Sequence, residues 1–99
     1  MRGPVVLPAA EQDMADAALW YESRSTGLGA EFLGSVNDSL SEIQRMPESF
    51  PVVHLTARRA LMRSFPYAVY FVIGAEAVHV IACMHVRREP RRWQGRANK

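Results

Sequence analysis

The segment YAVYFVI-GAE-AVHVIACMH, residues 67–85, decides the fold, because it has the pattern of two strands joined by a tight turn. Tyr67–Ile73 is almost wholly apolar and rich in aromatic and β-branched residues, and Ala77–His85 has a similar character. Gly74-Ala75-Glu76 is short enough to join them as a β-hairpin. A further strand is predicted at Ala60–Phe65, so the three strands form an antiparallel meander.

Upstream of the meander, apolar residues recur at helical spacing. Between residues 9 and 23 several alanines, Met14 and Tyr21 recur every three or four positions, and residues 30–46 carry a similar stripe. Gly27-Leu28-Gly29 separates the two segments, and Pro47 ends the second. The short link predicts an antiparallel helical hairpin.

Together these elements predict an α+β fold in a single domain spanning residues 1–99. The helical hairpin packs on one face of a small antiparallel sheet, and the order is β-α-α-β-β-β with a short C-terminal turn. The first strand is Val5–Leu7, and residues 47–57 are expected to form a loop. The tail from Pro90 is expected to form one helical turn at most and then to fray.

Charge is distributed unevenly along the chain. The formal net charge is +2, yet residues 1–55 carry a net −5 and residues 56–99 a net +7. Such asymmetry indicates that the C-terminal half meets an anionic partner, either nucleic acid, an acidic protein segment or the chain's own acidic half. No segment has the length and apolar character of a signal peptide or a membrane span, and a single cysteine fits a reducing cytoplasm.

The last strand has two different faces. Side chains alternate across a strand, which places Val78, Val80, Ala82 and Met84 toward the helices. The other face carries His79, Ile81, Cys83 and His85 beside Tyr67 or Tyr70, with arginines at its rim. A solvated face is normally more polar, so we expect a partner to cover this one. Proline has no backbone N–H, so Pro66 cannot donate a hydrogen bond to a neighbouring strand, and we expect a kink or bulge there.

The sequence has no metal or cofactor motif. His79 and His85 are six strand residues apart, roughly 20 Å, and no Cys or carboxylate cluster completes a ligand set. Glycine-rich phosphate loops and nucleophile elbows are absent as well. We therefore expect neither a metal nor a cofactor.

Metal-free RNA cleavage stays open as an interpretation. It needs a proton donor or acceptor, for which His85 is the candidate, and cations for phosphate, for which Arg63, Arg87 and Arg88 are candidates. Tyr67 and Trp93 could stack on a base. The alternative is that His85 caps the strand and Trp93 covers the end of the core.

Two segments resemble RelE/ParE superfamily toxins of type II toxin–antitoxin systems. One is RRALMRSFPYAVYF at residues 58–71, which is similar to the R-x-F-P-Y-x-V-x-F strand of that superfamily. The other is VIACMHVRREPRRW at residues 80–93, similar to a strand ending H-x-R-R-x-P-x-x-W. The helical region, with Gly27-Leu28-Gly29 and Phe32, has the same likeness, which covers nearly the whole chain.

The resemblance implies a toxin neutralised by an antitoxin that is encoded beside it. In the RelE branch the target is mRNA on the ribosome, and in the ParE branch it is DNA gyrase. This sequence departs from the RelE pattern, since Ala68 and Leu61 stand where basic residues are expected and Trp93 replaces a C-terminal tyrosine. A ParE-like gyrase inhibitor is therefore favoured, with a ribosome-dependent mRNA endonuclease as the alternative.

Two further classes remain, a folded but non-toxic member of the superfamily and a plain nucleic-acid-binding module. The second is disfavoured, because most basic residues of the C-terminal half lie at or after Arg87, in a tail and not on a helix that could enter a groove. The residues expected to bind the target or the antitoxin are Arg59, Arg63, Tyr67, Tyr70, His79, His85, Arg87, Arg88, Arg91, Arg92 and Trp93.

Overall fold

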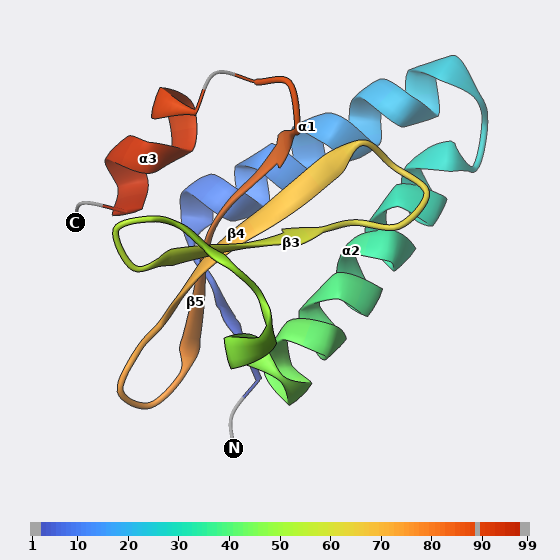
Figure 1. Ribbon diagram of the computed structural model, residues 1–99. Coiled ribbons are helices and arrows are strands. Elements are labelled where there is room, and N and C mark those ends of the chain that lie inside the picture. Colours follow the sequence, from blue (N-terminus) through green and yellow to red (C-terminus); the bar gives the residue numbers. More distant parts are fainter. Residues whose placement is uncertain (1–2, 89, 98–99) are drawn as a thin grey trace.

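Strands β4 (Tyr67–Ile73) and β5 (Val78–His85) form the centre of the sheet in the computed structural model, which describes residues 3–88 and 90–97 (Figure 1). The remaining elements are β1 (Val5–Val6), α1 (Pro8–Arg24), α2 (Leu28–Arg45), the 3-10 turn η1 (Pro47–Ser49), β2 (Val52–His54), β3 (Ala57–Leu61) and α3 (Arg91–Ala97). The strand order is β1-β5-β4-β3-β2, and all neighbours are antiparallel except β1, which is parallel to β5.

The predicted α+β architecture is confirmed, and its elements differ from the prediction chiefly at three places. The loop expected at residues 47–57 contains η1 and β2, because Val52 and His54 pair with the start of β3. The third strand from the end is Ala57–Leu61 and not Ala60–Phe65, because its pairing with β4 runs from Arg58 opposite Phe71 to Leu61 opposite Ala68. The expected C-terminal turn is a seven-residue helix, α3, held by contacts that the local sequence does not reveal.

The helical hairpin is closed by a carboxylate and by two glycines. Gly27 has φ 91°, a conformation that glycine adopts without strain. The Glu22 carboxylate accepts N–H bonds from Gly27 and Gly29, both at 3.0 Å, and these bonds lower the pKa of Glu22. A Cβ at Gly29 would lie 2.7 Å from the Ala18 carbonyl oxygen, so glycine at this position lets the two helices approach closely.

The helices α1 and α2 pack on one face of the sheet around a cluster of aromatic rings. Phe32 is fully buried and contacts the rings of Tyr21, Phe65 and Tyr67, with centroid separations of 5.1–5.3 Å. Burying one such side chain contributes about 1.5–3 kcal/mol. The cluster fixes the hairpin against the β3–β4 connection.

The side chains of β5 do not simply alternate between the two faces of the sheet, as the sequence predicted they would. The register shifts between Tyr70 and Phe71, because Tyr70 pairs with Ala82 and Phe71 with Val80, so Ile81 is the extra residue of a bulge. Beyond it the faces exchange, and Cys83 joins the helix-side core whereas Ala82 and Met84 join the opposite one. This bulge at Ile81 was not expected. The kink or bulge expected at Pro66 is present as a bend, in which the Tyr67 N–H bonds to the Phe65 carbonyl at 2.8 Å, and the Pro66 carbonyl accepts the Val86 N–H from the neighbouring end of β5.

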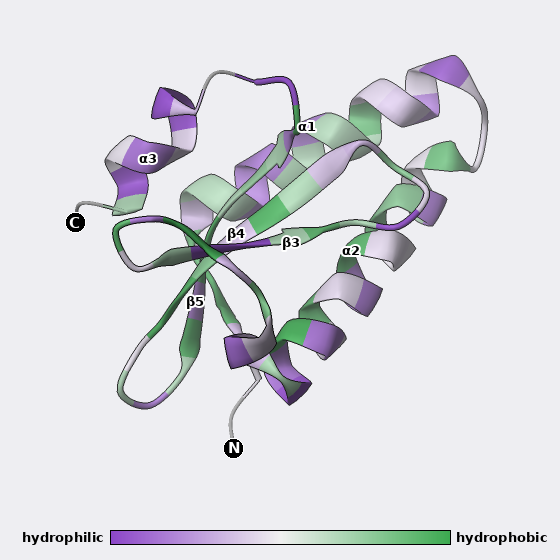
Figure 2. Ribbon diagram, viewed as in Figure 1, coloured by the Kyte–Doolittle hydropathy of each residue, from purple (hydrophilic) through white to green (hydrophobic). Residues whose placement is uncertain are grey.

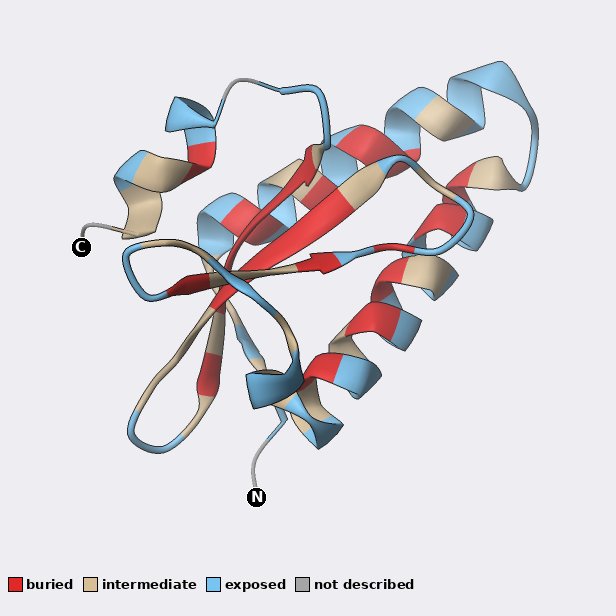
Figure 3. Cartoon of the chain, viewed as in Figure 1, coloured by how far each residue is buried: buried red, intermediate tan, exposed pale blue. Residues whose placement is uncertain are grey.

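The opposite face of the sheet is covered by α3 of the same chain. Trp93 is 5% exposed and its ring stacks on Tyr70, with the centroids 4.1 Å apart. Together they seal a second core that includes Ile81, Ala82 and Met84 (Figure 3). Figure 2 shows that α3 is otherwise mostly hydrophilic, which explains why its packing role is hidden in the sequence. A partner is not needed to cover this part of the sheet.

Candidate functional site

A wide groove lies between α1, the end of β5 and α3. Its volume is about 1160 Å³, which is large enough to admit a segment of a macromolecule. We name it the arginine groove. Its lining residues are Asp13, Asp16, Ala17, Trp20, Tyr21, Pro66, Tyr67, Cys83, Met84, His85, Arg87, Arg88, Arg92 and Arg96.

Three of its arginines are exposed and have no carboxylate partner among residues 3–88 and 90–97. Arg87 and Arg88 lie in the turn after β5, and Arg92 lies in the first turn of α3. The ion pairs of these described ranges join other residues, Glu42 with Arg45 and Asp13 with Arg96. Three unpaired cations around one groove repel each other, and an anionic partner would relieve this repulsion.

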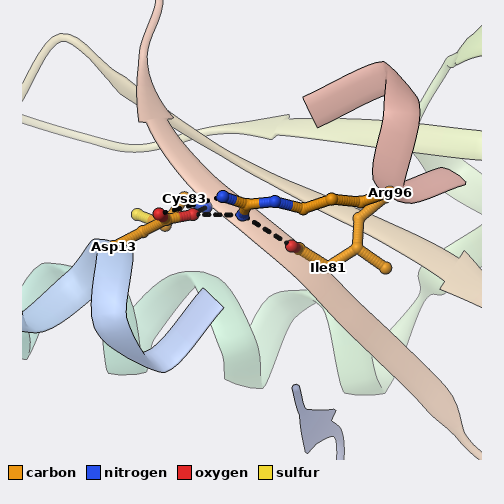
Figure 4. A network of polar contacts seen from close by, with 4 residues as sticks. All are labelled: Asp13, Ile81, Cys83 and Arg96. Atoms are coloured by element: carbon orange, nitrogen blue, oxygen red, sulfur yellow. Dashed lines mark hydrogen bonds and ion pairs between the residues drawn. The ribbon is translucent and has the colours of Figure 1, made fainter. Parts of the chain in front are cut away.

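The fourth arginine of the groove is structural. Arg96 of α3 donates to the Asp13 carboxylate at 2.6 Å and to the Ile81 carbonyl at 3.0 Å (Figure 4). Asp13 also accepts the Cys83 backbone N–H at 3.0 Å, so a single carboxylate joins α1, β5 and α3. Both side chains are partly buried, which makes these charge-assisted bonds stronger than surface ones. The network fixes α3 at the rim of the groove.

Tyrosine and histidine rings form one wall. Tyr67 and His85 are paired across β4 and β5, with ring centroids 5.4 Å apart. Burial raises the pKa of the Tyr67 phenol, so this group stays protonated and can donate a hydrogen bond. His85 accepts the Arg87 backbone N–H at Nδ1, and a neutral His85 therefore carries its proton on Nε2.

The structure brings some of the predicted site residues together and separates others. Tyr67, His85, Arg87, Arg88 and Arg92 line the arginine groove. Arg63 instead lies with α2 and the exposed end of β3, beside another groove, so the four nuclease candidates do not share one groove. Arg91 is exposed at the start of α3.

The other predicted residues lie deeper or farther away. Tyr70 and Trp93 are buried against each other, and burial raises the pKa of the Tyr70 phenol, which bonds to Arg59. His79 lies against Gly74, at the opposite end of β5 from His85. Tyr70, Trp93 and His79 therefore do not line the arginine groove.

The groove contains residues that the sequence pattern did not single out. Asp13 and Arg96, which form an ion pair, are 83 positions apart in the sequence. Trp20 forms part of the other wall of the groove; its side chain is 50% exposed, and Arg24 lies 4.4 Å from its ring centroid. In the sequence, the signal for this wall was Trp20, a large apolar residue outside the apolar stripe of the predicted helix. Among residues 3–88 and 90–97, no three His, Cys, Asp or Glu side chains group as metal ligands would.

Known proteins were compared with this chain by structure and by sequence. The fold is shared with a chain of the chromosomal ParDE TA system from P. aeruginosa. The two chains superpose with a TM-score of 0.65 and 13% identity, over 88% of this chain and 98% of that chain. The likeness to this ParDE chain therefore includes the helical hairpin and the sheet almost completely.

Sequence comparisons find no such likeness. No family model matches the chain, and no curated protein matches it. None of the helices in the described ranges is long and apolar enough to cross a membrane.

Proposed function

We propose that this chain is the toxin of a type II toxin–antitoxin pair, held inactive by a cognate antitoxin and acting on DNA gyrase in the cytoplasm. The observation that carries the proposal is the fold likeness to the ParDE chain over nearly the whole length of both chains. It agrees with the resemblance of residues 58–71 and 80–93 to RelE/ParE toxins, a resemblance drawn from motifs and not from the fold. Fold likeness alone is an analogy, so the site has to support the function independently.

The arginine groove supports a macromolecular partner of negative charge. Arg87, Arg88 and Arg92 are exposed around it, while Asp13 is neutralised by Arg96. An antitoxin segment rich in Asp and Glu would satisfy these cations and would speed association by electrostatic attraction. We therefore propose that the antitoxin, the gyrase complex or both contact this groove.

The choice of gyrase over RNA rests on how the candidate nuclease residues are arranged. Arg63 belongs to a different groove from His85, and Ala68, which stands where a basic residue was expected, is fully buried in β4. Cleaving RNA without a metal needs the acid, the base and the phosphate-binding cations within reach of one phosphate. The separation of Arg63 from the other candidates favours an inhibitor without nuclease chemistry.

A ribosome-dependent mRNA endonuclease is the second candidate, because one observation favours it. Tyr67, His85, Arg87 and Arg88 do line the same groove, and His85, in its imidazolium form, is the candidate general acid among them.

We expect that inducing the chain without its antitoxin blocks DNA replication and raises a DNA-damage response, with early protein synthesis intact. The measurement is the incorporation of labelled thymidine and labelled methionine in the minutes after induction, together with a supercoiling assay on purified gyrase. Rapid mRNA cleavage that is lost in His85→Ala or Arg63→Ala would contradict the gyrase target and establish the second candidate.

A further inference from the structure

Charge is separated across the sheet of this chain. The exposed carboxylates Glu31, Asp38 and Glu42 recur at helical spacing along α2, which packs on one face of the sheet. The opposite face is covered by α3, and the three unpaired cations of the arginine groove border that helix (Figure 1). A polyanion is therefore attracted to the arginine groove and repelled from α2, so that it approaches the chain in one orientation.

The basic C-terminal tail expected from the sequence is a docked helix. Nucleic acid was disfavoured as a partner because these residues were expected to fray, whereas they form α3. The Arg96–Asp13 ion pair fastens α3 to the rest of the chain. Arg92 is thereby held at the same groove as Arg87 and Arg88. A set of cations that is positioned in advance loses less conformational entropy on binding than a free tail does.

The polar side chains beside these cations can donate hydrogen bonds. Guanidinium groups have only N–H donors and match a phosphate group in a bidentate geometry. The Tyr67 phenol, whose raised pKa keeps it protonated, and the Nε2–H of neutral His85 add two donors at the same groove. Of the two carboxylates in the lining, Asp13 is paired and Asp16 lies on the α1 wall. The anionic oxygens of a phosphodiester carry only lone pairs, so they accept from all of these donors.

The aromatic rings of the groove favour a duplex over a single strand. Unpaired bases bind by stacking on exposed aromatic faces. The exposed ring of Trp20 has Arg24 at 4.4 Å and the Tyr21 ring at 5.0 Å from its centroid. The Tyr67 ring contacts Tyr21 and His85 edge-on. Because both rings already have neighbours, a row of phosphates is the feature of a nucleic acid that suits this groove.

The apolar part of the lining disfavours an acidic protein segment as the main occupant. Protein segments gain most of their affinity from apolar anchors that fill pockets on the partner. Ala17 and Met84 belong to the lining, but they are only 5% and 6% exposed. They therefore offer little area to an anchor, whereas the arginines are fully available to phosphate.

We infer that the arginine groove binds the phosphate backbone of duplex DNA through Arg87, Arg88 and Arg92. The inference rests on the proposed function for the source of that DNA, which is the segment held by gyrase. On this account the chain reaches gyrase through the DNA on which the enzyme acts. Contacts to phosphate carry no sequence information, so the chain binds duplexes of different sequence alike.

The salt dependence of binding tests the inference with the purified full-length chain. Each phosphate that a cation neutralises contributes about 0.9 to the slope of log K against log salt concentration. Three arginines predict a slope of about −2.7 for a labelled duplex of about 20 base pairs, measured by fluorescence anisotropy. Arg92→Ala should change the slope to about −1.8, and Arg87→Ala/Arg88→Ala to about −0.9 with at least about tenfold weaker binding at low salt.

Two controls separate phosphate binding from folding. Arg45→Ala removes an exposed arginine far from the groove and should keep the slope of about −2.7. Arg87→Lys/Arg88→Lys keeps both positive charges and should keep most of the slope, because counterion release depends on charge. A slope that Arg87→Ala/Arg88→Ala leaves unchanged, in a variant that melts normally, would overturn the inference.

Comparison ligands and gyrase itself give the remaining outcomes. A single strand of the same sequence, or a polyglutamate peptide, that binds more tightly than the duplex would overturn the assignment to duplex DNA. A chain that inhibits purified gyrase but does not bind the duplex contradicts the inference and leaves the proposed function intact. A chain that binds the duplex with the expected slope but leaves gyrase active contradicts the gyrase target, while the DNA site stands.

Discussion

Replacing Arg87 and Arg88 together with alanine should abolish growth arrest while leaving the protein folded. Both side chains are exposed and form no ion pair with the residues that the structure describes, so their loss should change the free energy of unfolding by no more than about 1 kcal/mol. The arginine groove, in contrast, loses two of its three unpaired cations. Charged contacts at a binding site determine both the association rate and the stability of the complex.

The matched control removes an exposed arginine that lies away from the arginine groove, in the variant Arg45→Ala. Arg45 pairs with Glu42, a contact that is worth little at a surface. The control should retain growth arrest. The measurements are a growth curve after induction and a thermal melt of each purified variant. A variant at Arg87 and Arg88 that melts far lower but arrests growth as strongly per folded molecule would assign these residues to the fold.

Replacing Asp13 with alanine should be among the most destabilising single changes at the rim of the groove. It removes the acceptor for Arg96 and for the Cys83 N–H, and it leaves a partly buried guanidinium without its counter-charge. Leaving such groups unsatisfied costs about 2–3 kcal/mol. We expect that loss in urea unfolding, together with faster hydrogen exchange throughout α3.

Asp16→Ala is the control for Asp13→Ala. Asp16 lies nearly one turn further along α1 and is exposed, and its carboxylate accepts a hydrogen bond from the Gln12 side chain at 2.8 Å. Its loss should cost less than about 0.5 kcal/mol. Adding Arg96→Ala to Asp13→Ala should recover part of the stability, because the unpaired guanidinium is then gone. Equal unfolding free energies for Asp13→Ala and Asp16→Ala would show that the network does not hold α3.

Local patterns predicted the helical hairpin and the two central strands because each has its own period and its own turn residues. Tyr67–Ile73 has the predicted bounds, and Val78–His85 begins one residue later than expected. The bulge at Ile81 could not be predicted, because an extra residue in one strand is set by its pairing partner. It changed the predicted faces of Ala82, Cys83 and Met84. Short β2 was missed since its few residues are stabilised only by pairing with β3.

The candidate site was predictable to the extent that its residues are adjacent in sequence. His85, Arg87 and Arg88 follow one strand, and their common groove follows from that proximity. The assignment of Trp93 to the binding surface is wrong, because its ring is buried and stacks on Tyr70; this fits the alternative interpretation that Trp93 covers the end of the core. The Asp13–Arg96 pair spans 83 positions and depends on where α3 docks, which no local pattern encodes.

Growth with and without the protein encoded beside this chain is the most direct test of the toxin proposal. The chain alone should arrest growth within one or two doublings after induction, and co-expression of the neighbouring acidic protein should restore growth and yield a complex that co-purifies. The account also predicts that restoration fails when the neighbouring protein is truncated so that it no longer binds. Unaffected growth after induction of a folded, soluble chain, with no complex formed, would contradict the assignment as the toxin of such a pair.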